Sequence, residues 1–242
     1  ASARSLALSC SFVTLAPTRP GDHRTLFWAF FVVVPLQYFL VWDNWYGLFS
    51  IFIPVFAYVL LPIRSAAACD SEHFLQRTGA IQWGLMICVY FVSHVPALLM
   101  LSIPGYAGQN GKLLLFLVLV VQISDVFQYV WGKLFGRTKI APTLSPNKTI
   151  EGLLGGFLIG TMGFWFAGLY QDWLSGVDAL IIGAAVAAIA PVGDLFESML
   201  KRDLGTKDTG TLFGPHGGIL DRLAAVFFTV VVGYYLSVAL VY

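Results

Sequence analysis

Seven nearly continuous apolar stretches constrain the fold of this chain more than any other feature. A helix needs about 20 mostly apolar residues to cross roughly 30 Å of hydrocarbon. The stretches are Leu26–Val41, Trp45–Ile63, Ile81–Ile103, Lys112–Trp131, Gly152–Tyr170, Asp178–Met199 and Leu223–Tyr242. A transmembrane β-strand would alternate polar and apolar residues, and these runs do not. The sequence therefore predicts an all-α fold, a polytopic integral membrane bundle of about seven transmembrane helices.

The composition excludes most soluble classes of protein. Apolar residues make up 58% of the chain and charged residues 11%, whereas about a quarter of a soluble domain is charged. A formal charge of +1 excludes a strongly basic nucleic-acid binder, so no nucleic-acid partner is expected. The three cysteines, Cys10, Cys69 and Cys88, are odd in number and scattered, which argues against a disulfide framework.

The chain shows no internal repeat, soluble domain or linker, so we expect residues 1–242 to form a single membrane domain. Residues 1–25 contain no apolar run long enough for a signal peptide and are expected to form a cytoplasmic arm. Little more than Asp43 and Asn44 separates the first two stretches, which predicts a tight helical hairpin. The remaining informative segments are the loops 132–151 and 200–222.

The cations indicate how the chain is oriented. With seven spans, thirteen of the fourteen Lys and Arg residues fall on one side, and only Lys112 falls on the other. Cytoplasmic loops carry the excess of Lys and Arg. The N-terminus and both loops are therefore predicted to be cytoplasmic, in a bacterial cytoplasmic membrane. A purely topological role is expected for Arg4, Arg19, Arg64 and Arg77.

Acidic residues inside the apolar stretches indicate a functional site. Asp125, Asp194 and Glu197 lie within spans, and Asp221 lies at the mouth of the last one. Such a carboxylate costs a few kcal/mol on insertion scales, so it normally faces a polar cavity and has a partner. The alternative is an interhelical hydrogen bond that only holds the bundle together. An Asp pair on adjoining helices near water also provides the hard oxygen ligands that suit Mg²⁺.

The span that carries Asp194 has two further features. Asp194, Glu197, Ser198 and Lys201 are spaced to share one helical face. Pro191 and Gly193 are expected to break this helix locally, which would free backbone carbonyls to bind an ion or water.

The two cytoplasmic loops are rich in groups that bind phosphate. The segment 198–222 contains four cations, one histidine and several glycines, and the segment 145–152 places Lys148 and Thr149 just before a span. Glycine lets backbone amides approach phosphate oxygens, while Lys and Arg neutralise them. A metal site flanked by such loops suits transfer between a nucleoside triphosphate and a lipid phosphate, which needs mainly positioning and charge neutralisation.

These loops carry a family resemblance. Residues in register with one long signature are Ser198, Lys201, Arg202, Lys207, Asp208, Gly210, His216, Gly217, Gly218, Asp221 and Arg222. The segment Ser145-Pro-Asn-Lys-Thr-Ile-Glu-Gly152 matches a second motif, and the stretch from Asp125 to Arg137 matches a third. Over about 100 residues the chain resembles the phosphatidate cytidylyltransferase (CDP-diacylglycerol synthase) family. One position departs: the last Asp of the signature is Ala224 here.

The resemblance implies an activity and its partners. The expected reaction converts CTP and phosphatidic acid to CDP-diacylglycerol and pyrophosphate in phospholipid biosynthesis, with Mg²⁺ as cofactor. Membrane lipids are the expected surroundings and a homodimer a further expectation. The implied catalytic residues are Lys201, Arg202, Lys207, Asp208, His216 and Arg222. The expected substrate-binding residues are Ser145, Lys148, Thr149, Glu151, Ser198, Gly217 and Gly218. The resemblance implies Asp194 and Asp221 as metal ligands, and Asp125 and Glu197 are further metal candidates because they are carboxylates inside the apolar spans.

Three alternatives remain open on the sequence alone. The first is a related CTP-dependent lipid enzyme, such as a polyprenol kinase or another CDP-lipid synthase, whose alcohol acceptor would need a general base. The second is a proton- or cation-coupled transporter that uses the intramembrane carboxylates as a relay. The third is a non-catalytic relative that binds lipid through the same loops.

Overall fold

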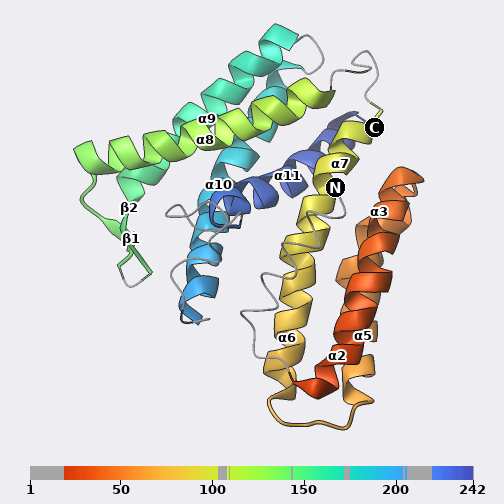
Figure 1. Cartoon of the computed structure of the whole chain (residues 1–242). Helices are drawn as coiled ribbons and strands as arrows, with labels where there is room; N and C mark the ends of the chain where they lie inside the picture. The colour runs from red at the N-terminus through yellow and green to blue at the C-terminus, as the bar shows by residue number, and fades with distance from the viewer. Residues whose placement is uncertain are drawn as a thin grey trace. The chain divides into compact units, whose positions relative to one another are not determined.

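A computed structural model of the chain describes residues 19–102, 108, 110–142, 144–171, 175–203, 205 and 220–241 (Figure 1). These residues form two compact units, the first within residues 19–100 and the second within residues 101–241. Each unit is described by itself below. The predicted single membrane domain for residues 1–242 stays a prediction.

The first unit contains three long helical spans. Its elements are η1 (Pro20–Asp22), α2 (His23–Trp28), η2 (Ala29–Val33), α3 (Val34–Trp42), α4 (Tyr46–Ile51), η3 (Phe52–Ala57), α5 (Tyr58–Ala66), α6 (Phe74–Leu85), η4 (Met86–Phe91) and α7 (Val92–Met100). Each span includes a π-helical segment, η2, η3 or η4. Pro54 lies inside η3 and Pro35 just after η2, and a proline removes the i→i−4 hydrogen bond that would keep the turn α-helical.

The predicted hairpin between the first two spans is confirmed. The chain turns at Asp43 and Asn44 and re-enters a helix at Tyr46. Asn44 has φ of 56°, a left-handed conformation that asparagine tolerates better than most residues. The turn brings α3 against α4, and the three spans share a buried core that includes Val34, Ile53 and Leu85.

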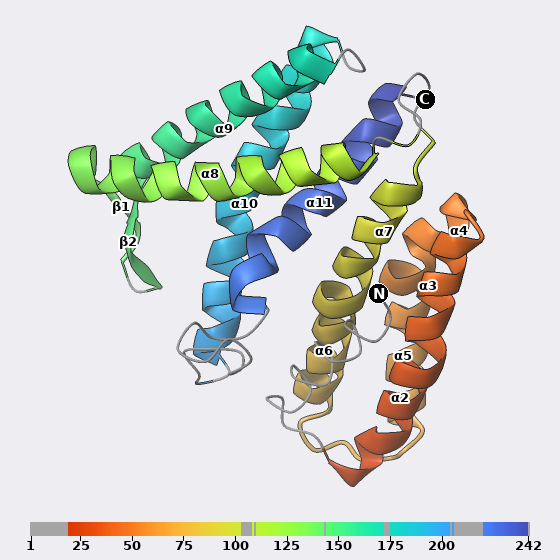
Figure 2. The ribbon, with the colours of Figure 1, turned by 45° about the horizontal axis from the view of Figure 1, so that its top comes forward.

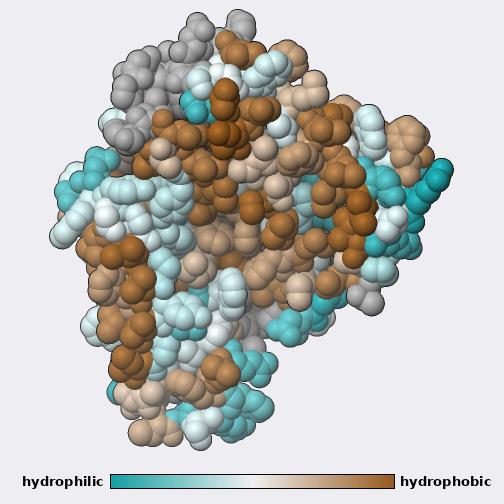
Figure 3. All heavy atoms as spheres, turned by 180° about the vertical axis from the view of Figure 1, so that it is seen from behind, coloured by the Kyte–Doolittle hydropathy of each residue, from teal (hydrophilic) through white to brown (hydrophobic). Residues whose placement is uncertain are grey.

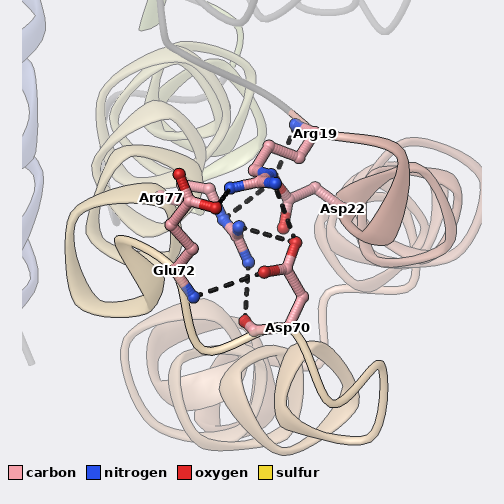
Figure 4. Close-up of polar contacts among 5 residues, drawn as sticks. All are labelled: Arg19, Asp22, Asp70, Glu72 and Arg77. Atoms are coloured by element: carbon pink, nitrogen blue, oxygen red, sulfur yellow. Dashed lines mark hydrogen bonds and ion pairs between the residues drawn. The ribbon is translucent and has the colours of Figure 1, made fainter.

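A cluster of charged residues closes the end of the first unit that lies away from this hairpin (Figure 4). Arg77 is buried, with Nε 3.2 Å from Asp22 Oδ2 and Nη1 2.9 Å from Asp70 Oδ2. Arg19 pairs with Asp70 and Glu72. The expectation that Arg19 and Arg77 have only a topological role is therefore wrong: they tie the start of α2 to the segment that leads into α6.

The second unit contains four long helices and a small sheet. Its elements are α8 (Asn110–Phe135), β1 (Lys139–Ala141), β2 (Ser145–Thr149), α9 (Ile150–Gln171), α10 (Gly176–Asp203) and α11 (Leu220–Val241). Figure 2 shows α8 and α9 side by side, with the β1–β2 hairpin at the end where they are joined. The strands are antiparallel and pair Lys139 with Thr149 and Ala141 with Ser145. The sequence prediction for residues 132–151 contained only a loop and missed this hairpin.

Glycines let α8 and α9 approach closely. A Cβ on Gly156 would lie 2.2 Å from Gln128 Cγ, and one on Gly152 would lie 2.6 Å from the carbonyl oxygen of Gln128. The Ser124 hydroxyl donates a 2.9 Å hydrogen bond to the carbonyl of Gly156 across this contact. Small residues at helix contacts are typical of membrane bundles, because they let backbones meet where lipid provides no hydrophobic drive.

The described residues contain seven helices long and apolar enough to cross a membrane, which confirms the predicted span number and the all-α membrane fold. Their outward-facing side chains are largely apolar, as the broad hydrophobic areas in Figure 3 show. One prediction is wrong: α10 continues unbroken from Gly176 to Asp203, with Pro191 inside it. Pro191 and Gly193 are buried, and a Cβ on Gly193 would lie 3.1 Å from Ala225 Cα. Gly193 thus serves close packing against α11.

Candidate active site

A pocket of about 200 Å³ lies in the second unit, where α8, the hairpin, α9 and α10 meet. Five of the predicted site residues line it: Asp125, Ser145, Lys148, Thr149 and Asp194. The other lining residues are Gln128, Tyr129, Ile140, Asn147, Leu153, Pro191 and Leu195. Segments up to 70 residues apart in sequence therefore contribute polar groups to one small space.

An ion pair in the pocket joins the hairpin to α10. Lys148 Nζ donates a 2.9 Å hydrogen bond to Asp194 Oδ2, as an ion pair. Both side chains are partly buried, with 24% and 30% of their surfaces exposed. Burial between packed helices reduces solvent screening, so this pair is held more firmly than a surface ion pair.

Asp125 adds a second carboxylate to the same wall. Its Oδ1 atom is buried and accepts no hydrogen bond from any residue that the structure describes. Asp125 lies ten residues before the end of α8 and Asp194 nine before the end of α10, which puts both roughly 14–15 Å inside their helices. The structure thus brings both carboxylates to one pocket.

Thr149 and Glu151 organise the framework around the pocket. Thr149 Oγ1 accepts a 3.2 Å hydrogen bond from the amide of Gly152, which caps the start of α9. Glu151 lies outside the pocket lining, and its carboxylate accepts hydrogen bonds of 3.0–3.3 Å from the amides of Arg137 and Thr138. The amide of Ile150 in turn donates to the carbonyl of Thr138. The hairpin that carries Lys148 is thereby tied at its base to the first turn of α9.

The predicted polar face of α10 is present, but only part of it reaches the pocket. Glu197 is buried and pairs with Lys201 at 2.8 Å, and Ser198 Oγ donates to the carbonyl of Asp194. None of these three α10 residues, Glu197, Ser198 or Lys201, lines the pocket. Arg202 is exposed near the end of the helix.

The remaining predicted residues lie outside what the structure describes. They are Lys207, Asp208, His216, Gly217 and Gly218, together with the side chains of Asp221 and Arg222. Among the described residues, no group of three or more His, Cys, Asp or Glu side chains is arranged to hold a metal ion. The carboxylates that the described part of the pocket offers to a metal are Asp125 and Asp194.

The sequence prediction missed three polar residues of the pocket, Gln128, Tyr129 and Asn147. Gln128 and Tyr129 follow Asp125 by three and four residues on α8 and so share its helical face, a spacing that the sequence does reveal. Asn147 lies within the motif that contains Lys148. Ala224, which replaces the last Asp of the signature, is buried in α11 and does not line the pocket.

Comparisons with known proteins show which family this chain resembles. Residues 6–240 match the model of the cytidylyltransferase family. The uncharacterized protein YnbB of Escherichia coli (strain K12) is 37% identical over 212 residues, which cover 88% of this chain and 70% of that protein.

Two relatives have a named activity. The phosphatidate cytidylyltransferase of Helicobacter pylori (strain ATCC 700392 / 26695) is 33% identical over 221 residues, covering 86% of this chain and 81% of that protein. The phosphatidate cytidylyltransferase of Aquifex aeolicus (strain VF5) is 37% identical over 152 residues, covering 62% of this chain and 56% of that protein. The family match covers nearly the whole chain and includes every element of the pocket, so the chain belongs to the cytidylyltransferase family.

Proposed function

We propose that this chain is an integral membrane nucleotidyltransferase that converts CTP and phosphatidate to CDP-diacylglycerol and pyrophosphate. The observation that carries the proposal is the pocket in which Lys148 meets Asp194 beside Asp125, within helices apolar enough to span a membrane. Two relatives that align with this chain are named for this activity. The site therefore combines a cation for phosphate with carboxylates for a metal, in a unit whose helices are apolar enough to span a membrane.

The reaction needs little covalent chemistry from the protein. A phosphate oxygen of phosphatidate attacks the α-phosphorus of CTP, a new P–O bond forms, and the bond to the β-phosphate breaks so that pyrophosphate leaves. The lipid phosphate is already anionic near neutral pH, so no strong general base is required. The main barrier is repulsion between two polyanions, which Lys148 and the cations of residues 201–222 relieve by binding phosphate oxygens.

Mg²⁺ fits the described part of the site. It is usually held by one or two carboxylates together with substrate phosphates and water, and Asp125 and Asp194 provide two carboxylates in one pocket wall. The buried Oδ1 of Asp125 has no hydrogen-bond donor among the described residues, which suits a metal or its water shell. We propose Asp194, Asp125 and Asp221 as the ligands of this ion. Glu197 acts indirectly, through its ion pair with Lys201. When bound, Mg²⁺ supplies positive charge that neutralises the triphosphate.

The chain's other site residues take supporting parts in this proposal. Ser145 and Lys148 face the substrates, while Thr149 and Glu151 hold the hairpin in place. Lys201, Arg202, Lys207 and Arg222 bind phosphates. Asp208, His216, Ser198, Gly217 and Gly218 complete the substrate site. These assignments follow the family motifs and are tested by substitution.

We also propose that the N-terminus and the segment 200–222 face the cytoplasm, where CTP is found. The division of cations, thirteen to one across the predicted spans, supports this orientation. The relatives compared above are bacterial, which supports a bacterial cytoplasmic membrane. A homodimer stays a prediction.

The test is pyrophosphate release by the purified protein in detergent micelles. The expected result is release that requires CTP, phosphatidate and Mg²⁺ together. A polyprenol replaces phosphatidate in a parallel reaction, and no turnover is expected with it because the proposal assigns both carboxylates of the described lining, Asp125 and Asp194, to the metal, which leaves no base there for an alcohol. CDP is measured alongside pyrophosphate, because a kinase transfers the γ-phosphate of CTP and releases CDP. CDP formation with polyprenol alone contradicts the proposal and favours a lipid kinase, while formation of neither product with either acceptor contradicts an enzyme.

A further inference from the structure

The amide of Gln128 is a buried hydrogen-bond donor that the site described so far does not use. Gln128 lines the pocket one helical turn beyond Asp125. Its Nε2 atom is buried and donates to no residue that the structure describes. Buried polar atoms in folded proteins nearly always have a partner, so a donor of this kind in a pocket wall indicates a ligand.

The packing of α8 against α9 fixes the position of this amide. A Cβ on Gly156 would lie 2.2 Å from Gln128 Cγ and 3.2 Å from Gln128 Cβ, so the stem of Gln128 fills the space that a side chain at 156 would need. The same glycine receives the Ser124 hydrogen bond at its carbonyl. The stem of Gln128 therefore packs against Gly156 on α9, which fixes the direction of its amide. Because this side chain is already ordered, it loses little conformational entropy when a ligand binds.

The neighbours of Gln128 indicate the chemistry of the ligand. The pocket also contains the Lys148 ammonium and the Ser145 hydroxyl, which suit an anion, and two carboxylates that suit a metal counter-ion. An amide N–H beside them is well matched to an oxygen of a metal-bound phosphate. A nucleotide and a phospholipid share this chemistry.

We propose that the Gln128 amide binds a substrate phosphate oxygen and thereby positions that phosphate beside Lys148 and Asp194. The inference rests on the proposed function, and it adds a substrate contact from a residue that is not among the predicted site residues. Gln128 acts in binding and holds no proton that the reaction transfers.

Gln128→Met is the direct test, because methionine keeps the unbranched stem over Gly156 and removes the donor. The expected result is a KM increase of about 10-fold or more for CTP or for phosphatidate, since hydrogen bonds to charged groups are among the stronger ones. A change for CTP alone assigns the contact to the nucleotide, and a change for phosphatidate alone assigns it to the lipid. Gln122→Met is the matched control, because Gln122 lies on the same helix and is exposed.

A second variant and a second readout keep the test decisive. Gln128→Glu retains the shape and places a negative charge beside the phosphate, so its KM should exceed that of Gln128→Met. If both variants have the same KM as wild type for CTP and for phosphatidate, the inference is overturned. If the wild-type protein releases no pyrophosphate, the proposed function fails instead. In that case the rise in melting temperature caused by CTP, and separately by phosphatidate in micelles, is measured for Gln128→Met and for wild type. Equal rises in the two proteins overturn the inference.

Discussion

Lys148 and Asp194 are 46 residues apart in sequence, yet their side chains meet at 2.9 Å in the pocket wall. The lysine comes from β2 and the aspartate from the C-terminal half of α10. In this arrangement the Lys148 ammonium donates a hydrogen bond to one oxygen of Asp194, the carboxylate that we propose as a metal ligand. Entry of a metal and a phosphate would give Asp194 a new cation and Lys148 a new anion, so both charges stay compensated when substrate binds.

Removing the charge of Asp194 should abolish most activity. Asp194→Asn keeps the shape but weakens both metal binding and the contact with Lys148. We expect kcat/KM to fall about 100-fold or more, the size typical of losing one essential electrostatic contact. Asp178→Asn is the control, because Asp178 is a half-buried aspartate in the first turn of the same helix, does not line the pocket, and contacts only Ser175 among the interactions described. Equal activity of the two variants would contradict the assignment of Asp194.

Lys148→Met tests the cationic side of the pair. Loss of the ammonium should raise KM for the phosphate substrates about 10-fold or more, because a partly buried charge-assisted contact is lost. Lys139→Met, on the neighbouring strand and exposed, should leave KM unchanged. Pyrophosphate release at varied CTP and phosphatidate concentrations measures both. A similar KM change in the two variants would indicate a general charge effect and refute a specific role.

Gly156→Ala tests the close contact between α8 and α9. The added Cβ would lie 2.2 Å from Gln128 Cγ and 2.8 Å from the carbonyl oxygen of Ser124, so the helices must move apart. We expect a loss of about 1–3 kcal/mol in the free energy of unfolding, as for other overpacked interiors. Gly163→Ala is matched on the same helix, where the nearest atom is Val120 Cγ2 at 3.8 Å. Unfolding in detergent micelles should show Gly163→Ala at least as stable as wild type, and equal destabilisation of both would be the contrary result.

Glu151→Ala should loosen the base of the hairpin. The carboxylate accepts hydrogen bonds from the amides of Arg137 and Thr138, so its removal should speed hydrogen exchange at these two amides. Glu151→Gln retains an acceptor oxygen and should show a smaller effect. If exchange at residues 137 and 138 is the same in both variants and in wild type, Glu151 does not hold the hairpin.

The charged cluster of the first unit predicts how stability depends on pH. The hydrogen bond from Arg19 lowers the pKa of Glu72 below its usual 4.5. Burial alone would raise the pKa of Asp70, but the amide of Glu72 and the side chains of Arg77 and Arg19 outweigh it, and this pKa is also lowered. A carboxylate with a lowered folded-state pKa stabilises the fold fully above its unfolded pKa, and this stabilisation disappears as the pH falls through the folded value.

Thermal unfolding between pH 7 and pH 3 measures this contribution. Arg19→Met should reduce stability at pH 7 and flatten its decline below about pH 4.5, the usual pKa of Glu72. Arg24→Met, an exposed arginine on α2, serves as the control and should keep the wild-type slope. Parallel curves for Arg19→Met and wild type would show that Glu72 gains nothing from its partner.

Hydropathy was sufficient to predict the spans, because a helix in lipid must satisfy its backbone internally and present apolar side chains. The hairpin at Asp43-Asn44 was also predictable, since only those residues interrupt two apolar runs. The continuity of α10 was not predictable, because a proline and a glycine so close together, Pro191 and Gly193, locally favour a break in a helix. Packing against Ala225 and Phe228 on α11 overrides them, and the sequence does not reveal that contact.

The site was predictable where helical spacing or a motif marks it. Asp125, Asp194 and Lys148 were all identified, and the structure brings them to one pocket. The part played by Glu151 was not predictable, because its partners are backbone amides, which have no sequence identity. The role of Arg77 was missed for a different reason: burial and pairing with Asp22 depend on how the ends of three spans meet.

The measurement that tests the central claim most directly follows the phosphorus atoms of CTP. The purified protein is given phosphatidate, Mg²⁺ and CTP labelled either at the α- or at the γ-phosphate. Our account predicts that the α-label enters the lipid while the γ-label leaves as pyrophosphate, and that Asp194→Asn abolishes both. Transfer of the γ-label to the lipid would identify a kinase, and failure of either label to move in the wild-type protein would contradict the proposed reaction.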